Sequence, residues 1–74
     1  MRTMNIKITT INDVYAVARE AEKVIGDITV KRGNYAVDGK SILGLFSLDM
    51  SQGVTFEYPD NAIEFEKFLS GFQV

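Results

Sequence analysis

The sequence predicts an α+β fold in which helices cover one face of a small, mainly antiparallel β-sheet. Segments that alternate between apolar and polar residues are interleaved with segments of helical periodicity. These segments follow one another in the order β-α-β-β-α-β-α, without a repeat, a linker or a low-complexity region. The length of 74 residues is that of one small domain, so we expect a single domain over residues 1–74.

The first two segments predict a strand followed by a helix. Residues 5–10 alternate as expected of a half-buried strand. Asn12 and Asp13 have side-chain oxygens that can accept hydrogen bonds from free helical N–H groups, so we expect one of them to cap the helix. Gly26 stands where a left-handed C-terminal cap is expected. The apolar face of this helix comprises Val14, Val17, Ala18, Ala21, Val24 and Ile25.

A β-hairpin is expected over residues 27–38. Residues 27–32 alternate again, and the dipeptide Gly33-Asn34 marks a tight turn that permits positive φ. Residues 35–37 supply the returning strand.

The second half of the chain predicts a short helix, a strand and a longer helix. Ser41 precedes an apolar segment and is suited to cap the short helix. Residues 54–58 alternate as the fourth strand, and Asn61 with Glu64 fits a capping box. The last helix has an apolar stripe of Ala62, Phe65, Leu69 and Phe72, with Phe68 beside it and Glu64, Glu66 and Lys67 facing solvent. The uncovered sheet face should be polar and should carry Lys7, Thr29, Lys31, Thr55 and Glu57.

Composition excludes several classes of function. The chain has no cysteine and no histidine, which excludes disulfides, thiolate chemistry and imidazole chemistry. The net charge is −2 and no basic stripe is visible, so we expect no nucleic-acid partner. The apolar runs are too short to span a membrane, and residues 1–4 lack the apolar segment of a signal peptide. We therefore expect a cytoplasmic protein without a membrane partner.

Two further patterns have simpler structural explanations. The segment from Gly33 to Ser41 has glycines and a Lys-Ser pair, but its spacing and its hairpin context differ from those of a phosphate-binding loop. The carboxylates Glu57, Asp60, Glu64 and Glu66 lie at a strand end, a turn and a helix surface, without the spacing of a hard-cation loop. Asp38 and Asp49 are interpreted as turn and loop residues. No metal site and no cofactor are expected.

The segment from Gly39 to Gly53 carries a family resemblance. It reads G-K-S-I-L-G-L-F-S-L-D-M-S-Q-G. With the hairpin before it and the strand and helix after it, the chain resembles the HPr family over about residues 5–72. HPr proteins are the small phosphocarriers of the sugar phosphotransferase system. The resemblance implies the HPr-like open-faced β-sandwich, with a four-stranded sheet covered on one face by helices.

The chain departs from the family pattern at the phosphate-carrying loop. Between its first strand and first helix, the family has a loop with a glycine, a phosphorylatable histidine, an arginine and a proline. Here the junction is Thr10-Ile11-Asn12-Asp13, which is several residues shorter, and no histidine is present. Asp13 could form an acyl phosphate, but no neighbouring residue in the sequence would bind the incoming phosphoryl group. We expect a protein that is not competent for histidine phosphotransfer.

Ser41 is the candidate phosphorylation site that the resemblance implies. In family members from many low-GC Gram-positive bacteria, an ATP-dependent kinase phosphorylates the matching serine, and the product docks on a transcriptional regulator of carbon catabolism. Lys40 before Ser41, and the residues Ile-Leu-Gly after it, match that pattern. The alternative is that Ser41 is only a helix cap, because a good cap and a good phosphorylation site need the same geometry.

The short helix after Ser41 is the candidate docking surface. In the family, the matching helix exposes an apolar patch that partner proteins bind. Periodicity places Leu45 and Leu48 in the core, which leaves other large apolar residues of this segment more exposed. The alternative is that these residues also pack into the core. The partner-binding candidates are Lys40, Ile42, Leu43 and Phe46.

The leading functional hypothesis is a regulatory or adaptor protein that is not an enzyme. Its partner would be a protein, for example the family's kinase or transcriptional regulator. The alternative is a divergent interaction domain of HPr fold with no role in the phosphotransferase system, since fold similarity does not transfer function. A third hypothesis is a homodimer through the apolar patch or an exposed sheet edge, so we expect a monomer or a weak homodimer.

Overall fold

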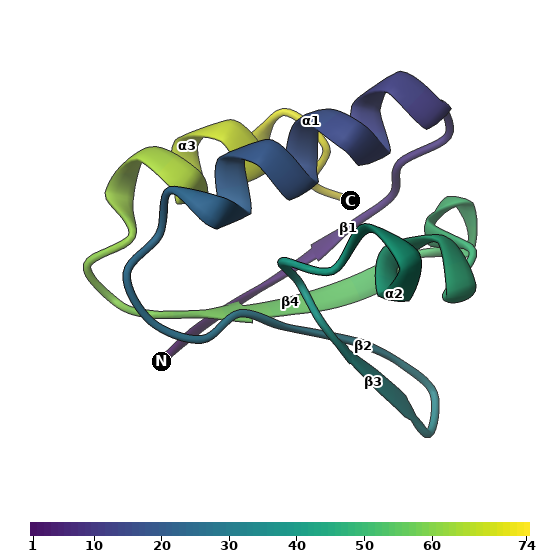
Figure 1. Ribbon diagram of the computed structural model, residues 1–74, viewed down its shortest axis with the longest axis horizontal. Helices are drawn as coiled ribbons and strands as arrows, with labels where there is room; N and C mark the ends of the chain where they lie inside the picture. The colour runs from purple at the N-terminus through teal and green to yellow at the C-terminus, as the bar shows by residue number, and fades with distance from the viewer.

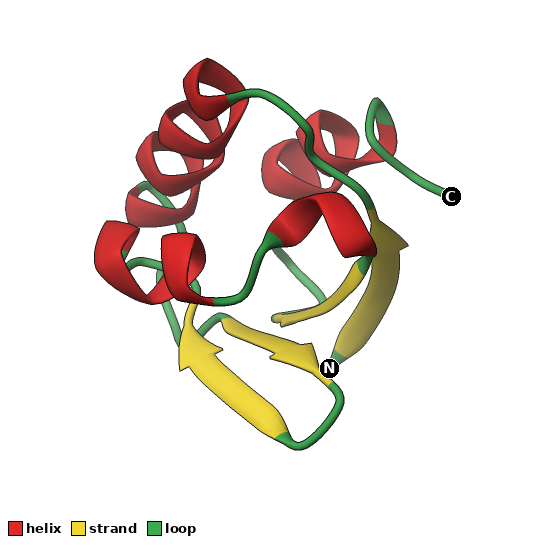
Figure 2. Ribbon diagram, turned by 90° about the vertical axis from the view of Figure 1, so that its right-hand side faces the viewer, coloured by secondary structure: helices red, strands yellow, loops and turns green.

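The computed structural model describes every residue from Met1 to Val74 and confirms the expected α+β architecture. The element order is β-α-β-β-α-β-α, with one additional 3₁₀ turn before the last strand. Three helices lie on one side of the sheet, with the β2–β3 hairpin at one end (Figures 1 and 2). The elements are β1 (Arg2–Ile6), α1 (Ile11–Glu22), β2 (Thr29–Arg32), β3 (Tyr35–Asp38), α2 (Ile42–Ser47), the 3₁₀ turn (Met50–Gln52), β4 (Val54–Tyr58) and α3 (Ile63–Ser70). None of these helices is long and apolar enough to cross a membrane.

The sheet has the strand order β1-β4-β2-β3, and every pairing is antiparallel. Its register aligns Met4, Phe56 and Val30 in one row across three strands, and all three are buried beneath the helices. Because side chains alternate along a strand, the next row faces solvent. That row consists of Asn5, Thr55 and Lys31, and the Thr55 hydroxyl donates to Asn5 Oδ1 over 2.7 Å.

The core is one apolar cluster between the sheet and the helices. It contains 17 buried residues and no buried charged side chain. The ring of Phe65 from α3 packs against Phe56 and Tyr58 of β4, with ring centroids 6.0 Å and 5.9 Å away. Burial of the apolar faces of α1 and α3 therefore fixes the position of both helices over the sheet.

The first strand lies earlier in the chain than the sequence predicted. It pairs with β4 from Arg2 to Ile6, whereas residues 5–10 were expected. Beyond Ile6 the backbone turns to other partners, since Lys7 N–H donates to Phe72 O and Ile8 N–H donates to Met50 O, both at 3.1 Å. Ile8 is still buried, so the apolar alternation continues for two residues beyond the end of the strand ladder at Ile6.

The ends of α1 also differ from the prediction. Thr10 caps the helix by accepting from Asp13 N–H over 3.2 Å, whereas Asn12 or Asp13 was expected in this role. The helix ends at Glu22. In the turn after it, Lys23 N–H donates to Glu20 O and Val24 N–H donates to Ala21 O, each three residues back in the chain instead of four. The expected core residue Ile25 is consequently 92% exposed, and Gly26 adopts φ 118° after the helix has ended.

The expected capping box of α3 does not form. Ala62 occupies the N-cap position, and no side chain caps the helix. Asn61 instead uses its backbone, because its carbonyl accepts from Ile63 N–H over 2.9 Å in a turn that follows Pro59. The expected stripe is otherwise correct: Phe65 and Leu69 are buried, and Ala62, Phe68 and Phe72 are partly buried against the core.

Candidate functional site

Ser41 lies at the N-terminus of α2, as the sequence predicted. Its backbone is extended (φ −97°, ψ 111°), and its hydroxyl oxygen accepts from Gly44 N–H over 3.2 Å. The side chain is partly exposed. The preceding loop holds this geometry, because Ser41 N–H donates to Asp38 O over 3.0 Å and Lys40 N–H donates to Asp38 Oδ1 over 2.9 Å.

Lys40 connects this loop to α1. Its ammonium group donates to the carbonyl oxygen of Val24 over 2.7 Å, just beyond the end of α1. This contact gives a donor to a carbonyl of the turn that follows the helix. Lys40 therefore has a structural contact in addition to its place next to Ser41.

The candidate docking residues of α2 differ in exposure. Leu43 is 80% exposed and Phe46 is 42% exposed, whereas Ile42 is partly buried against the core and thus less exposed than expected. Leu45 and Leu48 are buried, as the periodicity predicted. The helix therefore presents Leu43 and Phe46, which lie three positions apart and are neighbours on its surface.

Two residues of α1 extend this apolar surface. Tyr15 is half-exposed, and its ring packs edge-on against Phe46 with centroids 5.6 Å apart. Ile11 is 65% exposed and lines, with Phe46, a small depression of about 150 Å³. We call Ile11, Tyr15, Leu43 and Phe46 the α1–α2 apolar surface. Sequence reasoning missed Ile11, because it was assigned to the junction before the helix.

The depression lies where β1 leads into α1. The connection between them is short, running only from Lys7 to Thr10. Asp49 borders the depression in a left-handed conformation (φ 51°), and its carboxylate accepts from the Ser51 hydroxyl over 2.6 Å. No other titratable side chain lines it. Its chemistry is therefore suited to contact with an apolar partner.

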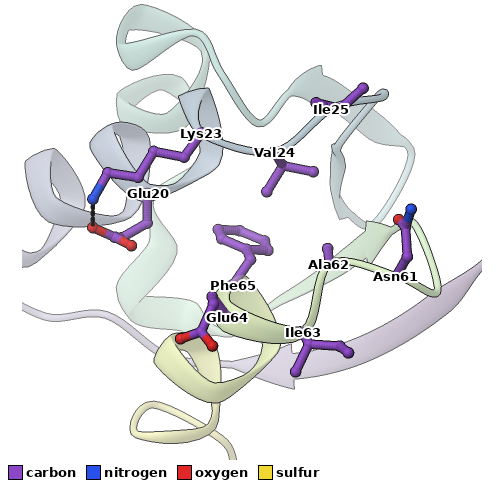
Figure 3. A pocket seen from close by; sticks show the side chains of 9 residues that line it. All are labelled: Glu20, Lys23, Val24, Ile25, Asn61, Ala62, Ile63, Glu64 and Phe65. Carbon is purple, nitrogen blue, oxygen red and sulfur yellow. Dashed lines mark hydrogen bonds and ion pairs between the residues drawn. The ribbon is translucent and has the colours of Figure 1, made fainter.

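A second apolar groove lies between the end of α1 and the start of α3 (Figure 3). It has a volume of about 310 Å³, and Val24 and Phe65 point into it. The ion pair of Lys23 and Glu20, 2.9 Å long, borders it. Sequence periodicity did not predict this groove. It placed Ile25 on the buried face of the helix, whereas Ile25 lies exposed at the rim of the groove.

A polar network links β4 to α3. The buried Tyr58 donates its hydroxyl to Glu66 Oε2 over 2.7 Å, and Arg2 Nε donates to the same oxygen. The hydrogen bond from Tyr58, followed by that from Arg2, lowers the pKa of Glu66. Burial and the bond to Glu66 raise the pKa of Tyr58. Glu66 was expected to face solvent, whereas its side chain is 30% exposed and is bonded to Tyr58 and Arg2.

The other acidic residues do not assemble into a site. Glu57 pairs with Lys31 over 2.9 Å, and Asp60 pairs with the Met1 ammonium group over 2.7 Å, which lowers the pKa of Asp60. No three Asp or Glu side chains lie where they could share a metal ion.

This open-faced sandwich, with a short capped helix beside α1, is the HPr-like fold, and known structures share it. The structure is similar to the crystal structure of HPr-C-His from Thermoanaerobacter tengcongensis, with a TM-score of 0.79 and 28% identity over 96% of this chain and 89% of that one. It is also similar to the crystal structure of a phosphocarrier protein HPr from Bacillus anthracis str. Ames, with a TM-score of 0.72 and 20% identity over 97% and 96%. No protein-family model and no curated protein matches the sequence. The shared fold supports a relationship to the HPr phosphocarriers.

Proposed function

We propose that this protein is an HPr-like regulatory or adaptor protein that binds a protein partner through the α1–α2 apolar surface. The observation that carries the proposal is the exposure of Leu43 and Phe46 beside Ser41, although Leu45 and Leu48 of the same segment are buried. A chain this small has few large apolar residues to spare from its core. Exposed apolar residues that gather in one place mark interaction surfaces.

The α1–α2 apolar surface is suited to binding because part of it is already ordered. Phe46 packs against Tyr15, so the two rings hold each other in place before a partner arrives. Aromatic anchors with few free rotamers lose little conformational entropy on association. Large aromatic side chains are also enriched among the residues that dominate binding energy.

Phosphorylation of Ser41 is the proposed control. A phosphate at this position would lie at the start of α2, beside first-turn N–H groups that have no intrahelical acceptor. It would also place about two negative charges within one helical turn of Leu43. A partner that contacts Leu43 would therefore sense whether Ser41 is modified.

We further propose that the protein neither carries a phosphoryl group on histidine nor acts as an enzyme. The 74 residues contain no histidine. The residues around the candidate site supply apolar contact area, a hydroxyl and the Lys40 ammonium group, which donates one of its hydrogen bonds to Val24 O.

The alternative is an interaction domain of HPr fold without a link to the phosphotransferase system. It is favoured by the structural roles of the family-like segment. Ser41 caps α2, Lys40 bonds to Val24 O, and a Cβ on Gly44 would lie only 3.1 Å from Val37 Cβ. A structural role in the fold is therefore a sufficient reason for the presence of each of these three residues.

The first experiment is incubation with the ATP-dependent serine kinase of the HPr family, followed by intact-mass spectrometry. We expect the mass of one phosphoryl group on the protein and none on Ser41→Ala. Peptide mapping should place the group on Ser41. Absence of modification at Ser41, with a true HPr substrate modified in the same tube, would favour the alternative.

A second experiment tests docking on the family's transcriptional regulator of carbon catabolism by calorimetry. Ser41→Asp and Ser41→Asn both retain a capping oxygen, so comparing them isolates the charge. Leu43→Ser should weaken binding at least tenfold, whereas Ile25→Ser, at an even more exposed residue outside the surface, should not. Equal binding by all four variants would contradict docking through the α1–α2 apolar surface.

A further inference from the structure

The outer side of β3 is an open sheet edge. β3 is the last strand in the order β1-β4-β2-β3, and no helix or strand lies along its outer side (Figures 1 and 2). At the other edge, the C-terminal residues cover the end of β1, where Val74 N–H donates to Asn5 O over 3.0 Å. An open edge can pair with a strand of another chain, because its outward N–H and C=O groups have no partner in the sheet.

The register of the β2–β3 hairpin identifies the free backbone groups of this edge. Gly39 N–H, just after β3, donates to Ile28 O over 2.8 Å. Hydrogen-bonded and non-bonded positions alternate along an antiparallel pair, so Ala36 and Asp38 occupy non-bonded positions and point their N–H and C=O groups away from β2. The Asp38 carbonyl accepts from Ser41 N–H over 3.0 Å. Both backbone groups of Ala36 are therefore left to face solvent.

The side chains of β3 suit pairing with a second copy of the chain. Val37 lies opposite the buried Val30, so Val37 and Tyr35 are on the side of the sheet that faces the helices. Tyr35 is nevertheless 73% exposed. The strand has no lysine, no proline and no bulge, which are the features that protect edge strands. Its one charged residue is Asp38, whose carboxylate accepts from Lys40 N–H over 2.9 Å.

We propose that two copies of this chain pair edge to edge through β3. In an antiparallel register centred on Ala36, this residue and the same residue of the second copy form a reciprocal pair of hydrogen bonds about a twofold axis. The same register places Tyr35 opposite the second copy's Val37, and aromatic and β-branched side chains are favourable cross-strand pairs. Asp38 lies opposite the second copy's Asn34, so no like charges meet. The two sheets then form one continuous sheet.

The contact is small, so the dimer should be weak. β3 has four residues, and an edge of this length buries less than the roughly 1,200 Å² at which stable interfaces begin. We expect a dissociation constant on the order of 0.1–1 mM. The contact uses β3 and none of the residues of the α1–α2 apolar surface, so it does not rest on the proposed function.

The test is sedimentation equilibrium of the full chain from about 20 μM to about 2 mM, a range that spans the expected dissociation constant. We expect the mass to rise from that of a monomer toward that of a dimer. Amide hydrogen exchange measured by NMR then locates the contact. Exchange at Ala36 should slow at least twofold at the highest concentration, whereas Val37, whose N–H already bonds to β2, should not change.

Variants separate this edge from other surfaces. Ala36→Pro removes the free N–H without breaking a hydrogen bond of the monomer and should weaken dimerisation at least tenfold. Tyr35→Ser keeps the backbone intact and should weaken it at least threefold, which retains the test if Ala36→Pro does not fold. The control is Ile25→Ser, which replaces a 92% exposed side chain elsewhere and should leave the affinity within twofold.

Two outcomes would overturn the proposal. The first is a monomer at the highest concentration. The second is a dimer that Leu43→Ser weakens and Tyr35→Ser does not, because the two copies would then meet through the α1–α2 apolar surface.

Discussion

The Tyr58 hydroxyl donates a 2.7 Å hydrogen bond to Glu66 and so joins β4, one of the two inner strands of the sheet, to the last helix. Arg2 from the neighbouring strand donates to the same carboxylate oxygen. Three elements therefore meet at one carboxylate, and two of the residues involved, Arg2 and Glu66, lie 64 positions apart in the sequence. The connection is polar, although it lies at the edge of an otherwise apolar core.

This network predicts a loss of stability in acid. Because Tyr58 and Arg2 lower the pKa of Glu66 in the folded state, its ionised form stabilises the fold above the ordinary carboxyl pKa, about 4.3. That contribution disappears as the pH falls through the lowered pKa of the folded state. Urea unfolding from pH 7 to pH 2 should show this decline.

The matched variants for the acid prediction are Glu66→Gln and Asp60→Asn. Glu66→Gln should be less stable at pH 7 and should show a flatter decline. Asp60→Asn should remove a separate part of the slope, since the Met1 ammonium group lowers the pKa of Asp60. An unchanged slope in Glu66→Gln would contradict the role assigned to this carboxylate.

The cap of α2 gives a prediction about Ser41 that is independent of its modification. Ser41→Ala should reduce the free energy of unfolding by about 1 kcal/mol, because Gly44 N–H loses its acceptor. Ser41→Asp should retain the stability of the original to within a few tenths of 1 kcal/mol, since its carboxylate caps equally well. Chemical denaturation measures both. If the Ser41→Ala variant had the same free energy of unfolding as the original protein, the hydroxyl would not act as a cap.

Replacement of two leucines of α2, Leu43 and Leu45, should affect stability to very different extents. Leu45→Ala should reduce the free energy of unfolding by about 2–5 kcal/mol, because it leaves a cavity in the core. Leu43→Ser should change it by about 0.5 kcal/mol or less, since this side chain is 80% exposed. A large loss of stability in Leu43→Ser would mean that Leu43 belongs to the core and is not free to bind a partner.

Gly39 should not tolerate a side chain. It is buried, and a Cβ at this position would lie 2.4 Å from Ile28 Cγ2 and 3.3 Å from the Ile28 carbonyl oxygen. Gly39→Ala should therefore reduce the free energy of unfolding by about 1–3 kcal/mol. Gly71→Ala serves as the control, because its Cβ would meet its neighbours at an ordinary 3.6 Å. Comparable stability of the two variants would contradict the close packing of Gly39 against Ile28.

Most of the fold could be predicted from local pattern. The alternation of Val30 with Lys31 predicted one face inside and one outside, and the register across β4 confirms it. Helix ends were less predictable. Thr10 and Asn12 are both good caps in isolation, and the choice between them depends on where the strand before them stops pairing.

The candidate site was predictable in part. Leu43 and Phe46 follow from helical periodicity once Leu45 and Leu48 are assigned to the core. The contact of Phe46 with Tyr15 does not follow, because it joins residues 31 positions apart through the packing of α2 on α1.

The sequence by itself determined the order of elements, the polar and apolar faces of the strands, the cap at Ser41 and the absence of histidine. These properties depend on residues within a few positions of one another, where hydrophobic periodicity and capping act. Only the tertiary structure decided that Ile25 is exposed, that Glu66 is bonded to Tyr58 and that Phe46 packs against Tyr15. These relationships depend on strand register and helix docking, which bring together side chains whose separation along the chain carries no local signal.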